Sequence, residues 1–442
     1  MLYVLLILIV FLIVLNYSLL KDVLSPSLLL CGVFAVSTVF SIIGNAFWEA
    51  EISFFAIFTI WLCLFLLCIG EIFARSGFSF GHSAKLNERR LNVIDKYELI
   101  YSKGLMLFLS VFCIIVCYLQ YRNILQLAYS VGYQSGNGNL LEAARWAMQA
   151  GNSGSIIVNI LVFASRGIGF ICSSVFINNI FSCGKLTLGI KKNFILLIPI
   201  LTLLFSTILS TSRNGLIGLI IMFFFYVFDC VRVKRKLNIG KIFKWGVASI
   251  VVFLLVFSIL GKSRGQSATL DTICIYAGSS IVAFSVWFSK GMNGSGSLFG
   301  SESFVGVHEL IARFFPNYKD LSLFDKFITF PNGSQTNIYT AFKAWIADFS
   351  WVGCLIFCLS VGFFFGIIYL KTIYKKYDSR TCLFRCVYAY FLYYLIYSFA
   401  TPELTTSFLS VTQLMEFFFI FVFYYLIFVS LNRRKKINGI QK

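Results

Sequence analysis

The feature that most limits the fold of this chain is a series of long apolar stretches that recurs from one end to the other. Each is close to the ~20 residues that an α-helix needs to cross about 30 Å of hydrocarbon. Hydrophobic residues make up 59% of the 442 residues and charged residues only 12%, more apolar surface than a soluble domain can bury. Backbone groups in lipid must be satisfied within the chain, and strict two-residue alternation is lacking, so we expect helices and not a β-barrel. The sequence predicts an all-α polytopic membrane protein.

About eleven transmembrane helices are predicted within a single transmembrane domain, residues 1–442. Their approximate bounds are 2–20, 27–44, 54–73, 104–121, 154–181, 194–210, 215–230, 245–260, 346–370, 386–401 and 409–430. The first stretch has no basic residue before its apolar core, and its first lysine, Lys21, follows that core. This order is the reverse of a cleavable signal peptide, so we expect a retained first helix with an external N-terminus.

The basic residues support this orientation. Of the 37 lysines and arginines, 26 fall in the loops and the C-terminal tail assigned to the cytoplasm, 10 in external loops and 1 within a span. This distribution follows the positive-inside rule. The net charge of +19 therefore reflects orientation in the membrane, and no nucleic-acid partner is expected.

Two predicted external segments are too long to be simple turns. Residues 122–153 contain LLEAARWAMQAG, whose mixture of apolar and polar residues at helical spacing predicts an interfacial helix. Residues 261–345 form a large external loop that is expected to contain short helices. Within it, 272–289 is apolar enough for an interfacial or re-entrant helix; a full crossing is less favoured, because it would place a basic loop or the tail outside.

Three arginines lie near the external half of the predicted membrane region: Arg166, Arg213 and Arg264. Each follows a serine and precedes a glycine, directly or after one residue. Arg213 could be an interface anchor, and Arg166 could pair with an intramembrane acid such as Glu416. The alternative that we favour is an anion site, because the planar guanidinium suits phosphate oxygens.

Few external groups could transfer protons. His308 is a candidate general base, with Glu302, Glu309 and Arg313 nearby in sequence, although a lone histidine is often structural. Asp348 and Glu403 are the other catalytic candidates, and Asp348 could equally cap its helix.

No metal site and no cofactor are expected from the motifs. The sequence has no HExxH, no P-loop, no nucleophile elbow and no cluster with metal-ligand spacing. The thirteen cysteines lie almost entirely in spans without a CxxC pair, which favours free thiols that serve as small apolar residues.

Two segments resemble a known family. ILSTSRNGLIGLII and, after the large loop, QTNIYTAFKAWIADFSWVGCLIFCLSVGFFFGIIY are similar to the O-antigen and capsule repeat-unit polymerases, the Wzy family. Ser350 stands where that family usually has glycine, and the resemblance covers about residues 160–430. The matching residues are Ser212, Arg213, Asn214, Gly215, Asn337, Tyr339, Thr340, Asp348, Phe349 and Gly353.

The resemblance implies a cofactor-free glycosyltransferase of the membrane GT-C type, active in lipopolysaccharide or related polysaccharide biosynthesis. Donor and acceptor would be glycans on undecaprenyl pyrophosphate in the bacterial cytoplasmic (inner) membrane, with the site facing the periplasm and the C-terminus in the cytoplasm. Arginines would hold the donor pyrophosphate, while Arg313, Asn337 and Tyr339 are candidates for binding substrate. A chain-length regulator and a flippase are implied partners. An O-antigen ligase, or a flippase as a transporter, remains an alternative.

Overall fold

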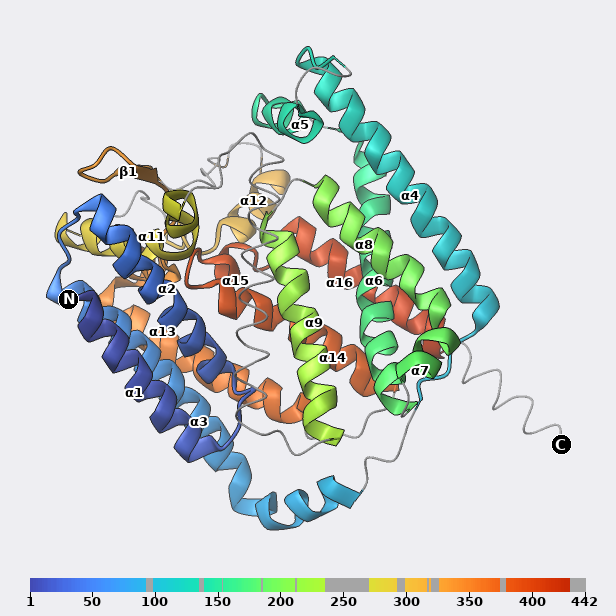
Figure 1. The fold of residues 1–442 in the computed structure, drawn as a ribbon, viewed down its shortest axis with the longest axis horizontal. Coiled ribbons are helices and arrows are strands. Elements are labelled where there is room, and N and C mark those ends of the chain that lie inside the picture. Colours follow the sequence, from blue (N-terminus) through green and yellow to red (C-terminus); the bar gives the residue numbers. More distant parts are fainter. Residues whose placement is uncertain are drawn as a thin grey trace. The chain divides into compact units, whose positions relative to one another are not determined.

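The computed structural model describes residues 1–442 except 93–97, 135–138, 153, 184–185, 211–212, 235–269, 292–298, 316–317, 319–325, 374–378 and 430–442. The described chain is almost entirely helical, and it is an all-α polytopic membrane protein (Figure 1). It divides into two compact units where the sequence predicted one domain. Unit 1 comprises Met1–Asn87, Thr269–Tyr374 and Phe391–Gln413, and unit 2 comprises Glu88–Ala268, Lys375–Tyr390 and Leu414–Lys442.

Unit 1 holds the N-terminal helices and the described part of the large loop. A short antiparallel hairpin in that loop pairs Ile328 with Thr336. Local signals are clear in α2, which has proline at its first position and whose Ser27 amide donates to a carboxylate oxygen of Glu71, 2.9 Å away. The elements of unit 1 are α1 (Leu2–Leu20), α2 (Pro26–Trp48), α3 (Phe54–Asn92, to Asn87 in this unit), α11 (Leu270–Ser289), α12 (Val305–Phe314), β1 (Ile328–Thr329), β2 (Gln335–Thr336), α13 (Ala341–Ile373) and α15 (Glu403–Thr406).

Unit 2 is a bundle in which α6 packs against α4, α8 and α9. The short helix α7 and the segment η1–α8 are bent by 71° relative to each other. Two helices, α14 (Ser379–Tyr397) and α16 (Val411–Tyr424), have most of their residues here. The other elements are α4 (Lys103–Ser130), α5 (Leu140–Gln149), α6 (Ile156–Ser182), α7 (Leu186–Lys192), η1 (Phe194–Leu196), α8 (Leu197–Leu209), α9 (Arg213–Lys234) and η2 (Tyr425–Val429).

The number of spans differs from the prediction. Within the described residues, 8 helices are long and apolar enough to cross a membrane, or up to 9 if the bent pair is one span. The predicted span 245–260 lies outside the described residues. Two others, 215–230 and 386–401, correspond to the shorter apolar helices Gly215–Val231 and Cys382–Tyr397. By this criterion the described residues hold eight or nine spans, fewer than the predicted eleven, one of which lies outside them.

Helix α11 also meets the length and composition of a span, although the sequence favoured an interfacial or re-entrant segment. Its contacts show how it packs against the α2–α3 hairpin. Asp271, near its start, accepts a hydrogen bond from the Trp48 indole, and the Gly278 carbonyl accepts one from Ser41. Near its end, Ser285 accepts one from the Ser53 amide. Trp48 and Ser41 of α2 are seven residues apart, as are their partners Asp271 and Gly278, and they pair in opposite order, so α11 runs antiparallel alongside the C-terminal half of α2. Whether α11 crosses the membrane stays a prediction.

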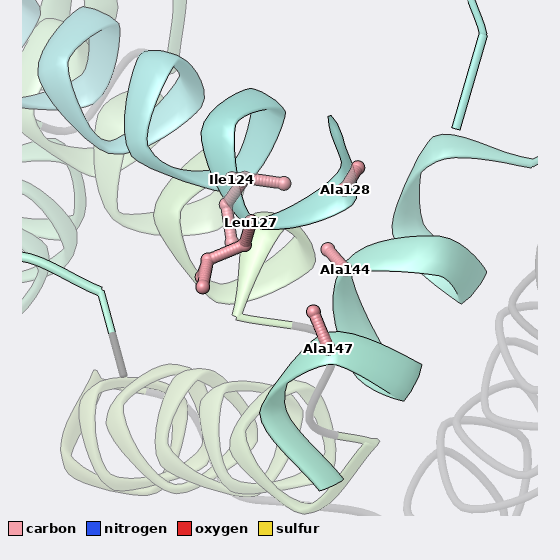
Figure 2. Close-up of a cluster of buried hydrophobic side chains, with 5 residues drawn as sticks. All are labelled: Ile124, Leu127, Ala128, Ala144 and Ala147. Carbon is pink, nitrogen blue, oxygen red and sulfur yellow. The ribbon is translucent and has the colours of Figure 1, made fainter. Parts of the chain in front are cut away.

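The predicted interfacial helix is α5, whose N-cap Asn139 accepts a hydrogen bond from the Leu141 amide. Figure 2 shows its small residues Ala144 and Ala147 facing Ile124, Leu127 and Ala128 of α4. Helix α4 ends at Ser130, nine residues beyond the predicted span end of 121, because it supplies this apolar surface. The exposed Trp146 on α5 fits a membrane-surface location, which stays a prediction.

Candidate functional site

The candidate site in unit 1 is built on the first part of α13. At Ser350 the backbone leaves the helical region, with φ 66° and ψ 172°, a conformation that is essentially restricted to glycine. A serine is therefore strained at this position, and glycine would adopt the same backbone without that strain. The bend ends a short helical segment, residues 341–349, that carries Lys343 and Asp348.

Asp348 holds the loop that leads into α12. Its carboxylate oxygens lie 3.2 and 3.3 Å from the amide nitrogen of Glu302, and one lies 2.6 Å from that of Ser303. The carboxylate thus accepts hydrogen bonds from a distant loop, and this contact is not the capping of its own helix that the sequence left open. A catalytic role for Asp348 stays a prediction; its contacts make it a positioning residue for Glu302.

The side chain of Glu302 is held by a second residue of the same helical segment. Lys343 Nζ lies 3.0 Å from Glu302 Oε2, and the two side chains are only 9% and 8% exposed. The same ammonium lies 4.8 Å from the centroid of the Tyr339 ring, within reach of a cation–π interaction. Sequence reasoning missed Lys343, although it is the one basic residue in the apolar segment YTAFKAWIADF.

Two predicted substrate residues precede this segment. Tyr339 is buried, and its hydroxyl donates to the Lys326 carbonyl at 3.0 Å, so the structure brings its ring, but not its hydroxyl, to Lys343. Asn337 is half-buried next to β2. The third, Arg313, is exposed in the last turn of α12. Their roles in binding substrate stay predictions.

His308 on α12 has partners at both ring nitrogens. Nδ1 forms a short hydrogen bond with the Tyr318 hydroxyl, and Nε2 lies 3.1 Å from the Phe299 carbonyl. A carbonyl can only accept, so this network assigns the proton to Nε2 and makes Nδ1 the acceptor from tyrosine. In this arrangement neither nitrogen is left to take a proton from a substrate.

Glu403, the remaining catalytic candidate, begins α15. Its carboxylate accepts a hydrogen bond from the Ser407 hydroxyl at 2.8 Å. The element is tied to α13 through the Trp345 indole, which donates to Thr405 Oγ1 at 3.1 Å, and it also packs against α12. Glu403 therefore lies on the scaffold of the same site, and its catalytic role stays a prediction.

The arginine candidates belong to unit 2. Arg166 Nη1 lies 3.3 Å from Glu416 Oε1, and the Tyr390 hydroxyl donates to the other oxygen of that carboxylate. This confirms the ion pair with Glu416 that the sequence suggested as the alternative to anion binding. Arg166 Nε is buried and has no hydrogen-bond partner among the described residues, so Glu416 does not use every donor of the guanidinium.

The glycine after Arg166 has a packing role. A Cβ at Gly167 would lie 3.0 Å from the backbone carbonyl carbon of Phe419, so this glycine permits close contact between α6 and α16. Arg213 is the first residue of α9, but its side chain, like the whole of Arg264, lies outside the described residues. The convergence of the three arginines on one anion stays a prediction.

Comparisons with known proteins do not assign the chain to a family. No protein-family model matches the chain, and neither a curated protein nor a solved structure does. A proposal about function therefore rests on the motifs and on the geometry described above.

Proposed function

We propose that this protein is a membrane glycosyltransferase that polymerises oligosaccharide repeat units carried on undecaprenyl pyrophosphate. The observation that carries the proposal is the buried Lys343–Glu302 ion pair on a loop fixed by Asp348, at the end of α13 that the predicted topology assigns to the periplasm. Ionisable groups in membrane helices are costly and mark functional sites by default. Sugar nucleotides are cytoplasmic, so a site on this side needs a lipid-linked donor.

The proposed reaction moves a growing glycan from its carrier onto a single lipid-linked repeat unit. An acceptor hydroxyl oxygen bonds to the anomeric carbon of the donor, while the bond from that carbon to the pyrophosphate oxygen breaks. The carrier pyrophosphate leaves with the bonding electron pair. The hydroxyl proton passes to a carboxylate, for which we propose Glu302.

Glu302 suits this role better than His308. Its ion pair with Lys343 fixes the direction of the carboxylate, and the Asp348 contact to its amide fixes its backbone. His308 has both nitrogens engaged by Tyr318 and Phe299. Base catalysis typically contributes about 10²- to 10⁴-fold in rate, so loss of the Glu302 carboxylate is expected to cost this order.

On the sequence motifs alone, the donor pyrophosphate is proposed to be held by arginines. Arg213 and Arg264 supply planar, always charged forks for phosphate oxygens, and Arg166 contributes the donors that Glu416 leaves. Positive charge beside the departing pyrophosphate stabilises the transition state as a metal ion would.

The test is the lipopolysaccharide ladder of a deletion strain complemented with variants of this protein, with protein abundance measured alongside. Glu302→Gln is expected to give single-unit material, whereas the control Glu51→Gln is expected to give wild-type ladders. Glu51 is an exposed carboxylate between α2 and α3 in the same unit. If the deletion strain has no attached glycan at all, the protein is a ligase or a flippase. An intact ladder in the deletion strain excludes the polymerase, the ligase and the flippase.

A double variant separates chemistry from stability. Glu302→Gln leaves Lys343 buried without its carboxylate, so the single variant could fail through misfolding alone. In Glu302→Gln/Lys343→Met both charges are removed, and abundance is expected to recover without activity. Recovery of full ladders in this variant would mean that the pair is structural and that Glu302 is not the base.

A further inference from the structure

Three cysteine sulfurs converge between α3 and α13 in unit 1. Cys63 lies on α3, and Cys354 and Cys358 lie one turn apart on α13. The three Sγ atoms lie within 4.8 Å of one another, and those of Cys63 and Cys354 are 3.9 Å apart. All three side chains are fully buried. Sequence spacing could not predict this group, because 291 positions separate Cys63 from Cys354.

Helix packing explains why small residues stand here. A Cβ at Gly70 would lie 2.1 Å from the Leu359 carbonyl oxygen, and one at Gly362 would lie 2.1 Å from that of Leu67. The two helices thus run side by side in close contact, as small residues permit in membrane proteins. Cys354, Cys358 and Gly362 follow one another at intervals of four residues, so they lie on the same face of α13. Alanine would satisfy the packing equally well, so packing does not account for three sulfurs at one point.

The sulfur separations match a metal-thiolate site. With metal–sulfur bonds of about 2.3 Å, trigonal or tetrahedral coordination places sulfurs about 3.8–4.0 Å apart, close to the 3.9 Å between Cys63 and Cys354. Thiolate ligands select soft cations. We propose that Cys63, Cys354 and Cys358 bind one thiophilic divalent cation, of which Zn²⁺ is the biological candidate.

Deprotonation of the three cysteines is part of binding, because the thiolate and not the thiol is the metal ligand. Binding converts three thiols to thiolates and releases three protons to water. Two thiolates neutralise the divalent cation, and the third leaves one net negative charge on the complex. The cation is structural: it joins α3 to α13 within two turns of the Ser350 bend, and it takes no part in glycosyl transfer.

Cadmium titration of the full-length protein in detergent tests the site. The protein is first reduced with a phosphine, freed of metal and followed by sulfur-to-cadmium charge-transfer absorption, with a chelator competing for the ion. One equivalent is expected to bind and to raise Tm. Cys63→Ala, Cys354→Ala and Cys358→Ala are each expected to weaken binding roughly 100-fold, because each removes one of three ligands.

Two controls isolate the site. Cys31→Ala removes one sulfur of a buried pair, Cys31 and Cys68, whose Sγ atoms are 3.7 Å apart, and Cys113→Ala removes a buried thiol from α4. Both are expected to bind cadmium as the wild type does. Serine variants replace any alanine variant whose metal-free Tm falls. Absence of saturable binding by the wild type, or unchanged affinity after loss of Cys63 or Cys358, overturns the proposal.

Discussion

The Lys343–Glu302 ion pair gives the sharpest prediction about stability. Both side chains are less than a tenth exposed, so either charge left alone is buried without its partner. Removing one member of a buried pair typically destabilises by about 3–5 kcal/mol. Lys343→Met and Glu302→Gln are each expected to lower the free energy of unfolding by this amount.

The double variant is expected to behave differently. Replacing a buried ion pair by uncharged side chains of similar size is often neutral or stabilising, so Glu302→Gln/Lys343→Met is expected to fall within about 1 kcal/mol of the wild type. The two changes are therefore strongly non-additive, with a coupling energy of at least about 5 kcal/mol. The measurement is unfolding of each variant by dodecyl sulfate in mixed micelles, followed by tryptophan fluorescence.

An exposed pair in the same chain provides the matched control. Lys192 and Glu98 are also in contact, but their side chains are 55% and 29% exposed, where solvent screens the interaction. Their coupling energy is expected to be far smaller than that of the buried pair. If the double-mutant cycle of Lys343 and Glu302 gives a coupling energy as small as that of this control, the effects of the single variants are additive. The pair is then solvated, and the reasoning from burial is refuted.

Three further changes test the backbone bend at Ser350, the close packing of α3 against α13, and the contact of Asp348 with the Glu302 loop. Ser350→Gly is expected to stabilise the protein by about 1–2 kcal/mol, because glycine adopts this backbone without strain; an unchanged or lower Tm would contradict the bend. Gly362→Ala is expected to destabilise the protein by about 2 kcal/mol or more, because the added methyl group meets the Leu67 carbonyl. The control Gly104→Ala has open space around it and is expected to leave the stability unchanged. Equal Tm values for the two variants would contradict the close packing of α3 against α13. Asp348→Asn keeps only one acceptor oxygen for the amides of the loop, so ladder formation is expected to fall about tenfold or more at normal abundance; wild-type ladders would disprove the positioning role.

The helices were predictable because each apolar run carries its own signal. A run of sufficient length has to be helical in lipid whatever its neighbours are. Most described helices begin close to the predicted starts, but α13 and α14 begin at Ala341 and Ser379, before the predicted 346 and 386. The bounds failed where a neighbour extends a helix, as α5 does for α4. The predicted span 245–260 lies outside the described residues, whereas α9 and α14, with 22 and 19 residues, match the predicted spans 215–230 and 386–401.

The site was only partly predictable, because its contacts join positions far apart in the sequence. Asp348 was identified from its motif, but its partner loop at Glu302 and Ser303 was not, since nothing local connects them. Lys343 was counted only among the basic residues of the large loop. Conversely, the Arg166–Glu416 pair was foreseen, because an arginine at membrane depth has few acids within a span to pair with.

Short motifs mix packing with chemistry, and the two can be separated residue by residue. In Ser165-Arg166-Gly167 the arginine forms the ion pair with Glu416, while the glycine allows α16 to pack closely against α6. At Ser350 a serine has a backbone conformation that glycine prefers. That position therefore specifies where the first segment of α13 ends, and hence where Lys343 and Asp348 meet the Glu302 loop. A variant at Ser350 or Gly167 that lowers both abundance and activity consequently reports on the scaffold, and only charged residues whose loss spares abundance can be assigned to the reaction.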